Sequence, residues 1–152
     1  MKQIRRKGAI VKIPLGNGYH TYARILSEAS FAIYDAKTNA DSYNLELLIK
    51  QPILFIVAVF NYAITKNLWK VIGFIPLEND LKRLPCKFIQ DPLNPDRFEI
   101  YDNGKIRQAL REECIGLERA QVWEPEQVEE RIRDFYAGRK NKWIKLDEEI
   151  FK

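Results

Sequence analysis

Histidine and cysteine, the side chains most often used for catalysis and metal binding, are scarce in this sequence of 152 residues. The single histidine, His20, stands beside a turn signal, and the two cysteines, Cys86 and Cys114, lie in unrelated segments. Without clustered ligands, and without a nucleophile placed against His20, the sequence predicts no metal site, no cofactor and no nucleophile–base pair. We expect His20 to be an exposed turn residue, and both cysteines to be small buried side chains without a disulfide.

Long apolar runs are also absent. The longest, Pro52–Phe60, is far shorter than the roughly 20 residues that a membrane-spanning helix needs. Residues 1–16 have a basic start but lack the apolar run and the small-residue cleavage site of a secretion signal. We therefore expect a cytoplasmic protein that does not enter a membrane.

The remaining familiar catalytic patterns are missing as well. The GNG at 16–18 is not a GxGxxG phosphate-binding loop. The carboxylate pairs Glu112-Glu113 and Glu129-Glu130 are adjacent in sequence, so their side chains point in different directions and do not form an acid/base pair. Since no catalytic role can be assigned, we expect a protein that is not an enzyme.

What the sequence does contain is an ordinary globular composition. Hydrophobic residues make up 46% and charged residues 30% of the chain, and 12% are aromatic. The length matches one typical domain, and no linker, repeat or low-complexity tract divides it. We therefore expect a single domain over residues 1–152.

Strand patterns dominate the first third of the chain. Gly8–Leu15 places Val11, Ile13 and Leu15 on one face at a period of two, and the GNG turn joins it to a return strand, Tyr19–Leu26. Phe31–Asp35 is a third short strand, and Tyr43–Lys50 fits one or two helical turns. These segments predict a hairpin that is extended by a further strand.

The middle of the chain predicts buried strands. Ile53–Phe60 is continuously apolar and rich in β-branched residues, as in a strand buried on both faces. Trp69–Ile75 returns as a second strand, in which Gly73 indicates a bulge or a close backbone approach. Cys86–Ile89 and Arg97–Tyr101 are two further strands.

The C-terminal third contains the clearest helix. Pro125–Ala137 begins with a proline suited to the first helical position, and Gly138 follows as a stop. Lys105–Cys114 fits either a strand or a helix, and the last residues form a polar tail with Trp143 and Ile144 as anchors. The sum is an α+β fold: a curved antiparallel sheet closing toward a small barrel, with one main C-terminal helix packed on it.

Charge is unevenly distributed along the chain. The net charge of +4 combines +6 over residues 1–110, −4 over residues 111–134 and +2 over residues 135–152. Because partners meet local surfaces rather than the sum, the acidic block indicates an interaction surface.

Six short stretches follow one another in a characteristic order. They are GAIVKIPLGNGYHTYARIL at 8–26, FAIYD at 31–35, PILFIVAVFNYAI at 52–64, WKVIGFIPLE at 69–78, GLERAQVW at 116–123 and VEERIRDFYAG at 128–138. This ordered set resembles the immunity protein 26 family of bacterial polymorphic toxin systems, of the contact-dependent inhibition type, and the resemblance extends from Gly8 to Trp143. It implies a small cytoplasmic protein without enzymatic activity, which binds and blocks the active domain of a toxin encoded beside it.

Our hypothesis is that the acidic block meets the toxin, for example a nuclease, whose phosphate-binding surface must be basic. An aromatic side chain, Trp123 or Tyr136, would serve as an anchor if it is exposed. If the toxin is not a nuclease, the basic segments 1–12 or 139–145 become the alternative contact. A second reading, a small basic module that binds nucleic acid or the ribosome, also stays open. The predicted partner-binding residues are Glu112, Glu113, Glu118, Trp123, Glu126, Glu129, Glu130 and Asp134.

Overall fold

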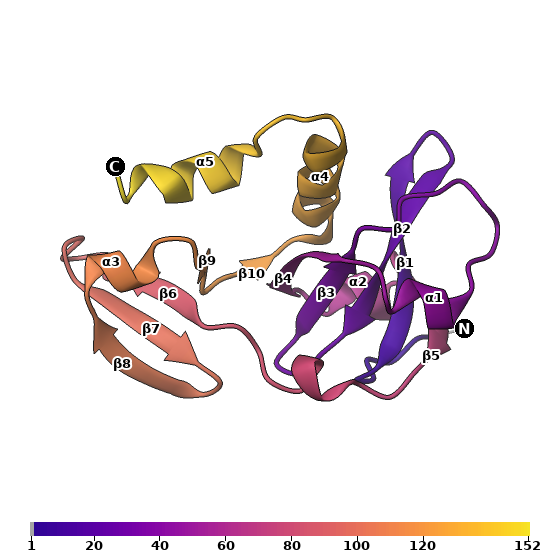
Figure 1. Ribbon diagram of the computed structural model, residues 1–152, viewed down its shortest axis with the longest axis horizontal. Coiled ribbons are helices and arrows are strands. Elements are labelled where there is room, and N and C mark those ends of the chain that lie inside the picture. Colours follow the sequence, from indigo (N-terminus) through magenta and orange to yellow (C-terminus); the bar gives the residue numbers. More distant parts are fainter. Residues whose placement is uncertain (1) are drawn as a thin grey trace.

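The computed structural model describes residues 2–152, and its strands form two sheets (Figure 1). The strands of the larger sheet are β1 (Ala9–Gly16), β2 (Tyr19–Ile25), β3 (Ser30–Tyr34), β4 (Ile53–Val59), β5 (Lys70–Phe74) and β10 (Val122–Trp123). They lie in the order β10–β4–β3–β2–β1–β5. The smaller sheet contains β6 (Lys87–Gln90), β7 (Phe98–Asp102), β8 (Lys105–Ala109) and β9 (Glu118–Arg119), in the order β8–β7–β6–β9.

Five α-helices accompany the sheets in residues 2–152, and three of them are single turns. They are α1 (Leu45–Leu48), α2 (Tyr62–Thr65), α3 (Arg111–Cys114), α4 (Pro125–Tyr136) and α5 (Lys142–Glu149). A short 3₁₀ turn, Asn79–Leu81, interrupts the connection between the two sheets. The main predicted helix is therefore confirmed as α4, with its proline at the first turn.

The predicted hairpin between β1 and β2 is confirmed. Gly16, Asn17 and Gly18 all have positive φ, at 91°, 54° and 79°, a conformation that glycine adopts without a steric penalty. The two strands pair antiparallel, with Ile13 opposite Thr21. The turn thus sets the register of the first two strands of the larger sheet.

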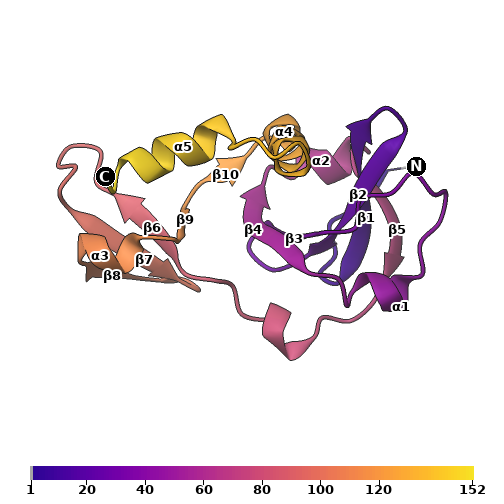
Figure 2. The same ribbon diagram turned by 45° about the horizontal axis from the view of Figure 1, so that its top comes forward.

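Both faces of the larger sheet are covered (Figure 2). On one face, α2 and α4 pack over alternate residues such as Val11, Phe31 and Val57. On the other face, α1 packs over Tyr22, and the connection 76–85 contributes its own small apolar cluster. Two-sided burial explains why β2 and β3 are buried along nearly their whole length.

Strand β5 forms one edge of the larger sheet and contains the predicted irregularity. Gly73 pairs with Ile10 and Val71 pairs with Val11, so Ile72 is an extra residue that bulges out of the ladder. A Cβ on Gly73 would overlap the side chain of Leu45 in α1. The prediction of a bulge or a close approach is confirmed on both counts.

Arg24 fixes the chain that leaves β5. Its side chain is fully buried and donates hydrogen bonds to the carbonyl oxygens of Gly8 at 3.0 Å, Ile75 at 2.6 Å and Pro76 at 2.8 Å. It also forms an ion pair with Glu78 at 3.1 Å. These bonds fasten the C-terminal end of β5 to the centre of the sheet.

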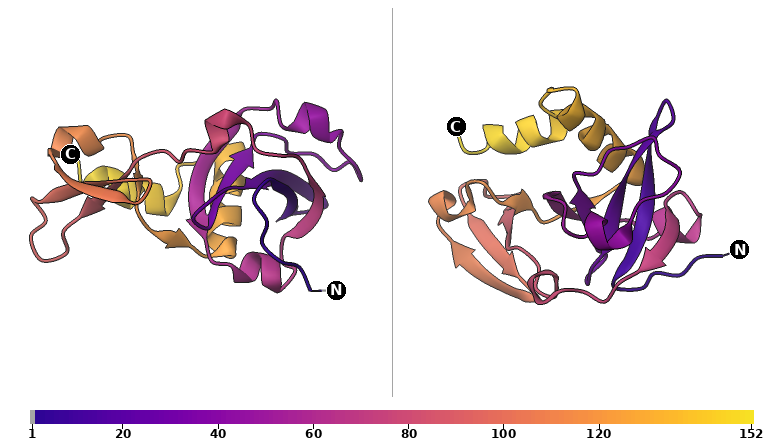
Figure 3. Two further views of the ribbon diagram at one scale, coloured as in Figure 1. Left: turned by 90° about the horizontal axis from the view of Figure 1, so that it is seen from below. Right: turned by 45° about the vertical axis from the view of Figure 1, so that its right-hand side comes forward.

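The smaller sheet has its own apolar core, formed by Phe88, Phe98, Ile100 and Cys114. Helix α5 links the two cores, as Figure 3 shows from two sides. Trp143 at its start packs against the core of the larger sheet, and Phe151 just beyond its end packs against that of the smaller sheet.

The α+β class is confirmed, but the structure corrects the arrangement of the sheet. Closure toward a barrel is not found, because the chain leaves the larger sheet after β5 and builds the smaller one, so that β5 and β10 remain edges. The sheets are also not purely antiparallel, since β10 pairs parallel with β4 and β9 pairs parallel with β6.

Two segments differ from the prediction. The polar tail after Gly138 contains the helix α5, which Asn141 caps by accepting a hydrogen bond from the Trp143 amide at 3.0 Å. The segment 105–114, for which the sequence allowed a strand or a helix, contains one after the other: the strand β8 is followed by the helix α3.

The expected exposure of His20 is wrong, because its residue exposure is only 5%. Its Nε2 lies 2.9 Å from the hydroxyl of Tyr22, and its backbone pairs with Thr38 in the loop after β3. Burial lowers the pKa of the His20 imidazole. Both cysteines are free thiols, but only Cys114 is buried, whereas Cys86 is half-buried.

Candidate functional site

The eight predicted partner-binding residues fall on separate parts of the structure. Glu112 and Glu113 lie on α3, beside the smaller sheet. Glu118 lies on β9, a strand of that sheet. The remaining five lie on β10 and α4, against the larger sheet (Figure 1). The structure therefore does not gather the acidic block of the sequence into one surface.

Near the smaller sheet, two of the three predicted carboxylates already bind partners within the chain. Glu113 accepts a hydrogen bond from the Leu110 amide at 2.7 Å and forms an ion pair with Arg107 at 3.1 Å. Glu118 binds the guanidinium of Arg131 with both oxygens, at 3.0 and 2.7 Å. Glu112 is exposed and forms no ion pair with any residue in 2–152.

The carboxylates at the C-terminal end of α4 also have partners. Asp134 accepts hydrogen bonds from Arg139 at 3.3 Å and from the Asn141 amide group at 3.0 Å. Glu130 lies 3.7 Å from the ammonium group of Lys142. Arg139 and Lys142 are both largely exposed, so these ion pairs are weak and a stronger partner can replace them.

Glu129 faces the core rather than solvent. Its carboxylate accepts a hydrogen bond from the indole N–H of Trp69 at 2.9 Å. Burial raises the pKa of the Glu129 carboxyl, and the bond to Trp69 opposes that rise. This carboxylate fastens α4 to the sheet and is not a free contact.

Trp123 is a core residue. It is 2% exposed and packs with Val59 and Val128 in the core of the larger sheet. The guanidinium of Arg131 lies 5.2 Å from its ring centroid. Its burial removes Trp123 from direct contact with a partner in this conformation.

Glu126 is the one predicted residue of α4 that is both exposed and without an ion pair in the part of the chain described here. It stands in the first turn of the helix, one residue after Pro125. The neighbouring Glu124 accepts a hydrogen bond from the hydroxyl of Tyr62 in α2, which raises the pKa of Tyr62 to about 12. The start of α4 therefore carries negative charge at the surface.

A pocket of about 420 Å³ opens beside this end of α4. Its lining includes three apolar side chains that are 44–59% exposed: Phe60, Val122 and Leu146. The carboxylate of Glu124 also lines it, as does the ion pair between Arg119 and Asp147 at 2.9 Å. Exposed apolar side chains combined with polar and charged groups are the usual composition of a protein-binding site.

Two tryptophans complete the lining of this pocket. The indole N–H groups of Trp123 and Trp143 are buried and have no acceptor within residues 2–152. Phe60, Val122 and Leu146 do not stand out as a site in the sequence, because they come from three distant segments that only the fold brings together.

The basic segments that served as the alternative contact are partly engaged. Arg5 is half-buried and donates hydrogen bonds to the carbonyl oxygens of Leu26 at 2.9 Å and Ser30 at 3.2 Å. Lys140 forms an ion pair with Glu148. Lys2 and Arg6, in contrast, line a second pocket at the edge of β5.

A search of residues 2–152 for a gathered set of three potential metal ligands finds none. Over the same residues, no helix combines the length and the apolarity that crossing a bilayer requires.

Comparison with known proteins relates the first two thirds of the chain to a protein family. The model of a protein family described as Immunity protein 26 matches residues 6–99, from the start of the larger sheet into β7. No curated protein and no solved structure matches the chain. All eight predicted partner-binding residues lie outside the matched range.

Proposed function

Because the chain belongs to the immunity protein 26 family, we propose that it binds a cognate bacterial toxin domain and neutralises it by direct association. The toxin belongs to a polymorphic, contact-dependent inhibition type of system in this proposal. Neutralisation takes place in the cytoplasm and involves no catalytic step. Because a toxin that stays free remains active, the proposed function requires the chain to bind the toxin tightly and rapidly.

The observation that carries the proposed binding surface is the pocket beside the start of α4. Phe60, Val122 and Leu146 expose apolar area there, next to the carboxylate of Glu124 and the Arg119–Asp147 ion pair. Burial of such apolar centres supplies most of the affinity of protein interfaces, while the surrounding charges set orientation and partner choice.

The charge at this surface favours a basic toxin face. Glu126 is exposed beside the pocket and unpaired in the described chain. Glu130, further along α4, is paired with the exposed Lys142, which a toxin arginine or lysine can replace, whereas Asp134 is also bound by the buried Asn141. A nuclease must present positive charge to its phosphate-bearing substrate, so a nuclease is the toxin class that this surface fits best.

Rescue by co-expression tests the function itself. The toxin domain encoded beside this gene is expressed with and without the chain, and growth is expected only when the chain is present. Failure of the chain to protect, with the folded protein present at normal level, would reject neutralisation.

Charge reversal at Glu126 tests the surface. We expect Glu126→Lys to weaken toxin binding by about tenfold at physiological salt, because an attractive contact becomes repulsive. Isothermal titration with the purified toxin domain measures the affinity. Glu46→Lys is the matched control, because Glu46 is an exposed, unpaired glutamate on α1, which covers the other face of the larger sheet. Equal affinity of both variants would remove this surface from the interface.

A further inference from the structure

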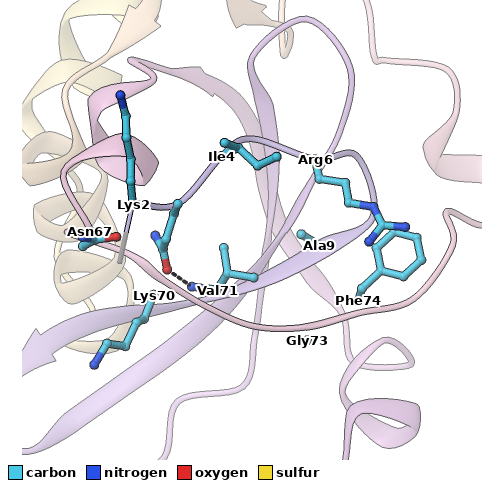
Figure 4. A pocket seen from close by; sticks show the side chains of 10 residues that line it. Lys2, Ile4, Arg6, Ala9, Asn67, Lys70, Val71, Gly73 and Phe74 are labelled. Carbon is cyan, nitrogen blue, oxygen red and sulfur yellow. Dashed lines mark hydrogen bonds between the residues drawn. The ribbon is translucent and has the colours of Figure 1, made fainter.

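A second pocket, of about 730 Å³, lies along the free edge of β5 (Figure 4). Strand β5 is the last strand of the larger sheet and pairs on one side only, with β1. Residues 2–6 run beside its other side but form no strand. The pocket is the groove between this N-terminal segment and the edge strand, and we call it the β5 groove.

The β5 groove carries positive charge only. Lys2, Arg6 and Lys70 line it, and no aspartate or glutamate does. None of the three cations forms an ion pair within residues 2–152. Uncompensated cations around a concave site attract an anionic occupant.

The floor of the groove is apolar. Ile4, Val71 and Phe74 contribute to the lining, and Ile4 is 76% exposed. The guanidinium carbon of Arg6 lies 3.7 Å from the centroid of the Phe74 ring, so this arginine covers the ring face (Figure 4). Phosphate groups gain nothing from an apolar floor, and Arg6 occupies one face of the single aromatic ring in this lining, which disfavours stacking of a nucleic-acid base.

At the start of β5, the side chain of Gln3 forms hydrogen bonds with the backbone that a neighbouring strand would otherwise form. The side-chain amide of Gln3 accepts a hydrogen bond from the Val71 N–H at 2.7 Å and donates to the Trp69 carbonyl at 3.0 Å. From Ile72 to Phe74, no hydrogen bond other than those of the pairing with β1 is formed within residues 2–152. An extended peptide can therefore continue the sheet where the contacts of Gln3 end.

The groove is also held in shape before anything binds. Gln3 fastens the N-terminal segment to the start of β5, and Arg24 fastens the chain just after its end through the carbonyls of Ile75 and Pro76. A site whose walls are fixed in advance loses less conformational entropy on binding.

We propose that the β5 groove is a second binding surface, which takes an extended acidic segment of a protein partner as an added strand along β5. Carboxylates of that segment face Lys2, Arg6 and Lys70, and its alternate apolar side chains lie against Val71 and Phe74. The inference goes beyond the proposed toxin neutralisation, because it needs neither a toxin nor the pocket beside α4.

Three probes test this assignment on the full chain. They are an eight-residue peptide of alternating glutamate and valine, the same peptide with lysine in place of glutamate, and a single-stranded oligothymidylate of eight nucleotides. Fluorescence anisotropy at low and physiological salt measures binding up to about 1 mM probe, the range of weak peptide sites. We expect the acidic peptide alone to bind, and more weakly as salt is raised.

Lys70→Glu places the binding in the groove. This substitution should weaken binding of the acidic peptide by about fivefold or more at low salt, because one cation of the rim becomes an anion. Lys50→Glu, an exposed and unpaired lysine after α1, is the matched control and should bind as the native chain does. Amide hydrogen exchange of Ile72 and Phe74 should slow when the peptide is bound, which a purely electrostatic contact would not cause.

Four results would overturn the inference: no binding of the acidic peptide, equal binding of the lysine peptide, preference for the oligothymidylate, or binding unchanged by Lys70→Glu. A chain that fails these tests but protects cells from its toxin leaves the proposed function intact. The two conclusions are therefore tested separately.

Discussion

At the scale of single residues, Glu129 shows how a carboxylate in an acidic block can serve the core. It is half-buried and accepts the indole hydrogen bond of Trp69. Because burial raises its pKa in the folded chain, the folded state takes up a proton more readily than the unfolded state. The free energy of unfolding must then decrease as pH rises from the ordinary carboxyl value of 4.5 through the raised one.

We predict that Glu129→Gln raises the urea midpoint at pH 7, since the amide oxygen still accepts the bond from Trp69 while the buried charge is gone. The gain should disappear at about pH 4 and below, where the native carboxyl is protonated. Glu46→Gln, at an exposed and unpaired glutamate on α1, is the control and should leave both midpoints unchanged. A lower midpoint for Glu129→Gln at pH 7 would contradict the assignment.

Gly8 is a second residue whose identity is fixed by geometry. Its φ is +93°, and a Cβ there would stand 2.8 Å from the carbonyl oxygen of Ile75. Gly8→Ala should reduce the free energy of unfolding by more than about 1 kcal/mol, as an alanine forced to positive φ does. Gly138→Ala separates the effect of backbone strain from that of steric overlap. Gly138 also has a positive φ, +70°, but nothing lies within 4 Å of an added Cβ. Denaturant unfolding should rank Gly8→Ala as the more destabilised of the two.

At the scale of elements, α5 depends on its cap. Asn141 is 5% exposed, accepts a hydrogen bond from the Trp143 amide and donates one to Asp134 at 3.0 Å. Asn141→Ala should cost about 1–2 kcal/mol of unfolding free energy, the upper range for a lost helix cap. Asn44→Ala removes the corresponding cap of α1 at an exposed position and should cost less. Equal losses would mean that the second bond of Asn141 contributes nothing.

Elements with a local signal could be predicted from the sequence. The GNG turn fixes the β1–β2 hairpin, and Pro125 and Gly138 mark the ends of α4. Helix α5 was missed because Trp143 and Ile144 pack on one core while Phe151 packs on the other, so the segment lacks a single apolar stripe. The division into two sheets was missed because β10 is two residues long and pairs with β4, more than 60 residues earlier.

The candidate site was harder to predict than the fold. A run of acidic residues indicates charge along the chain, but not which carboxylates the fold neutralises. Glu118 is paired with Arg131, and Glu129 is turned to Trp69. Neither partner is visible as a partner from the sequence. Of the acidic residues predicted to bind a partner, only Glu112 and Glu126 are both exposed and without an ion pair in the described chain.

At the scale of the whole molecule, α5 and its end join two separate cores. Arg119 of β9 also binds Asp147 of α5 at 2.9 Å. We therefore propose that the two sheets unfold as one domain, and predict that Trp fluorescence and far-ultraviolet circular dichroism give the same thermal midpoint for the native chain. Trp69 and Trp123 make the fluorescence a probe of the larger sheet.

Phe151→Ala should split this single transition. Phe151 packs against Phe88 and Phe98, with ring centroids 5.2 and 5.6 Å apart. Phe151 is partly buried, so its loss removes about 1–3 kcal/mol of packing from a small core, and the circular dichroism signal should begin to change below the fluorescence midpoint. Leu146→Ala, which truncates an exposed residue of α5, should keep the two midpoints together. Two transitions in the native chain would instead show independent units.

The placement of β10 and α4 has a consequence for biosynthesis. The ribosome makes the first five strands of the larger sheet early, but the side chains that close its core, Trp123, Val128 and Ile132, are made near the end. Until they leave the exit tunnel, α2 and Trp69 give Val11, Phe31 and their neighbours only partial cover. A truncated product that stops before residue 122 would therefore expose an apolar sheet face and become a substrate for quality-control proteases. Protection is available only from nearly complete chains.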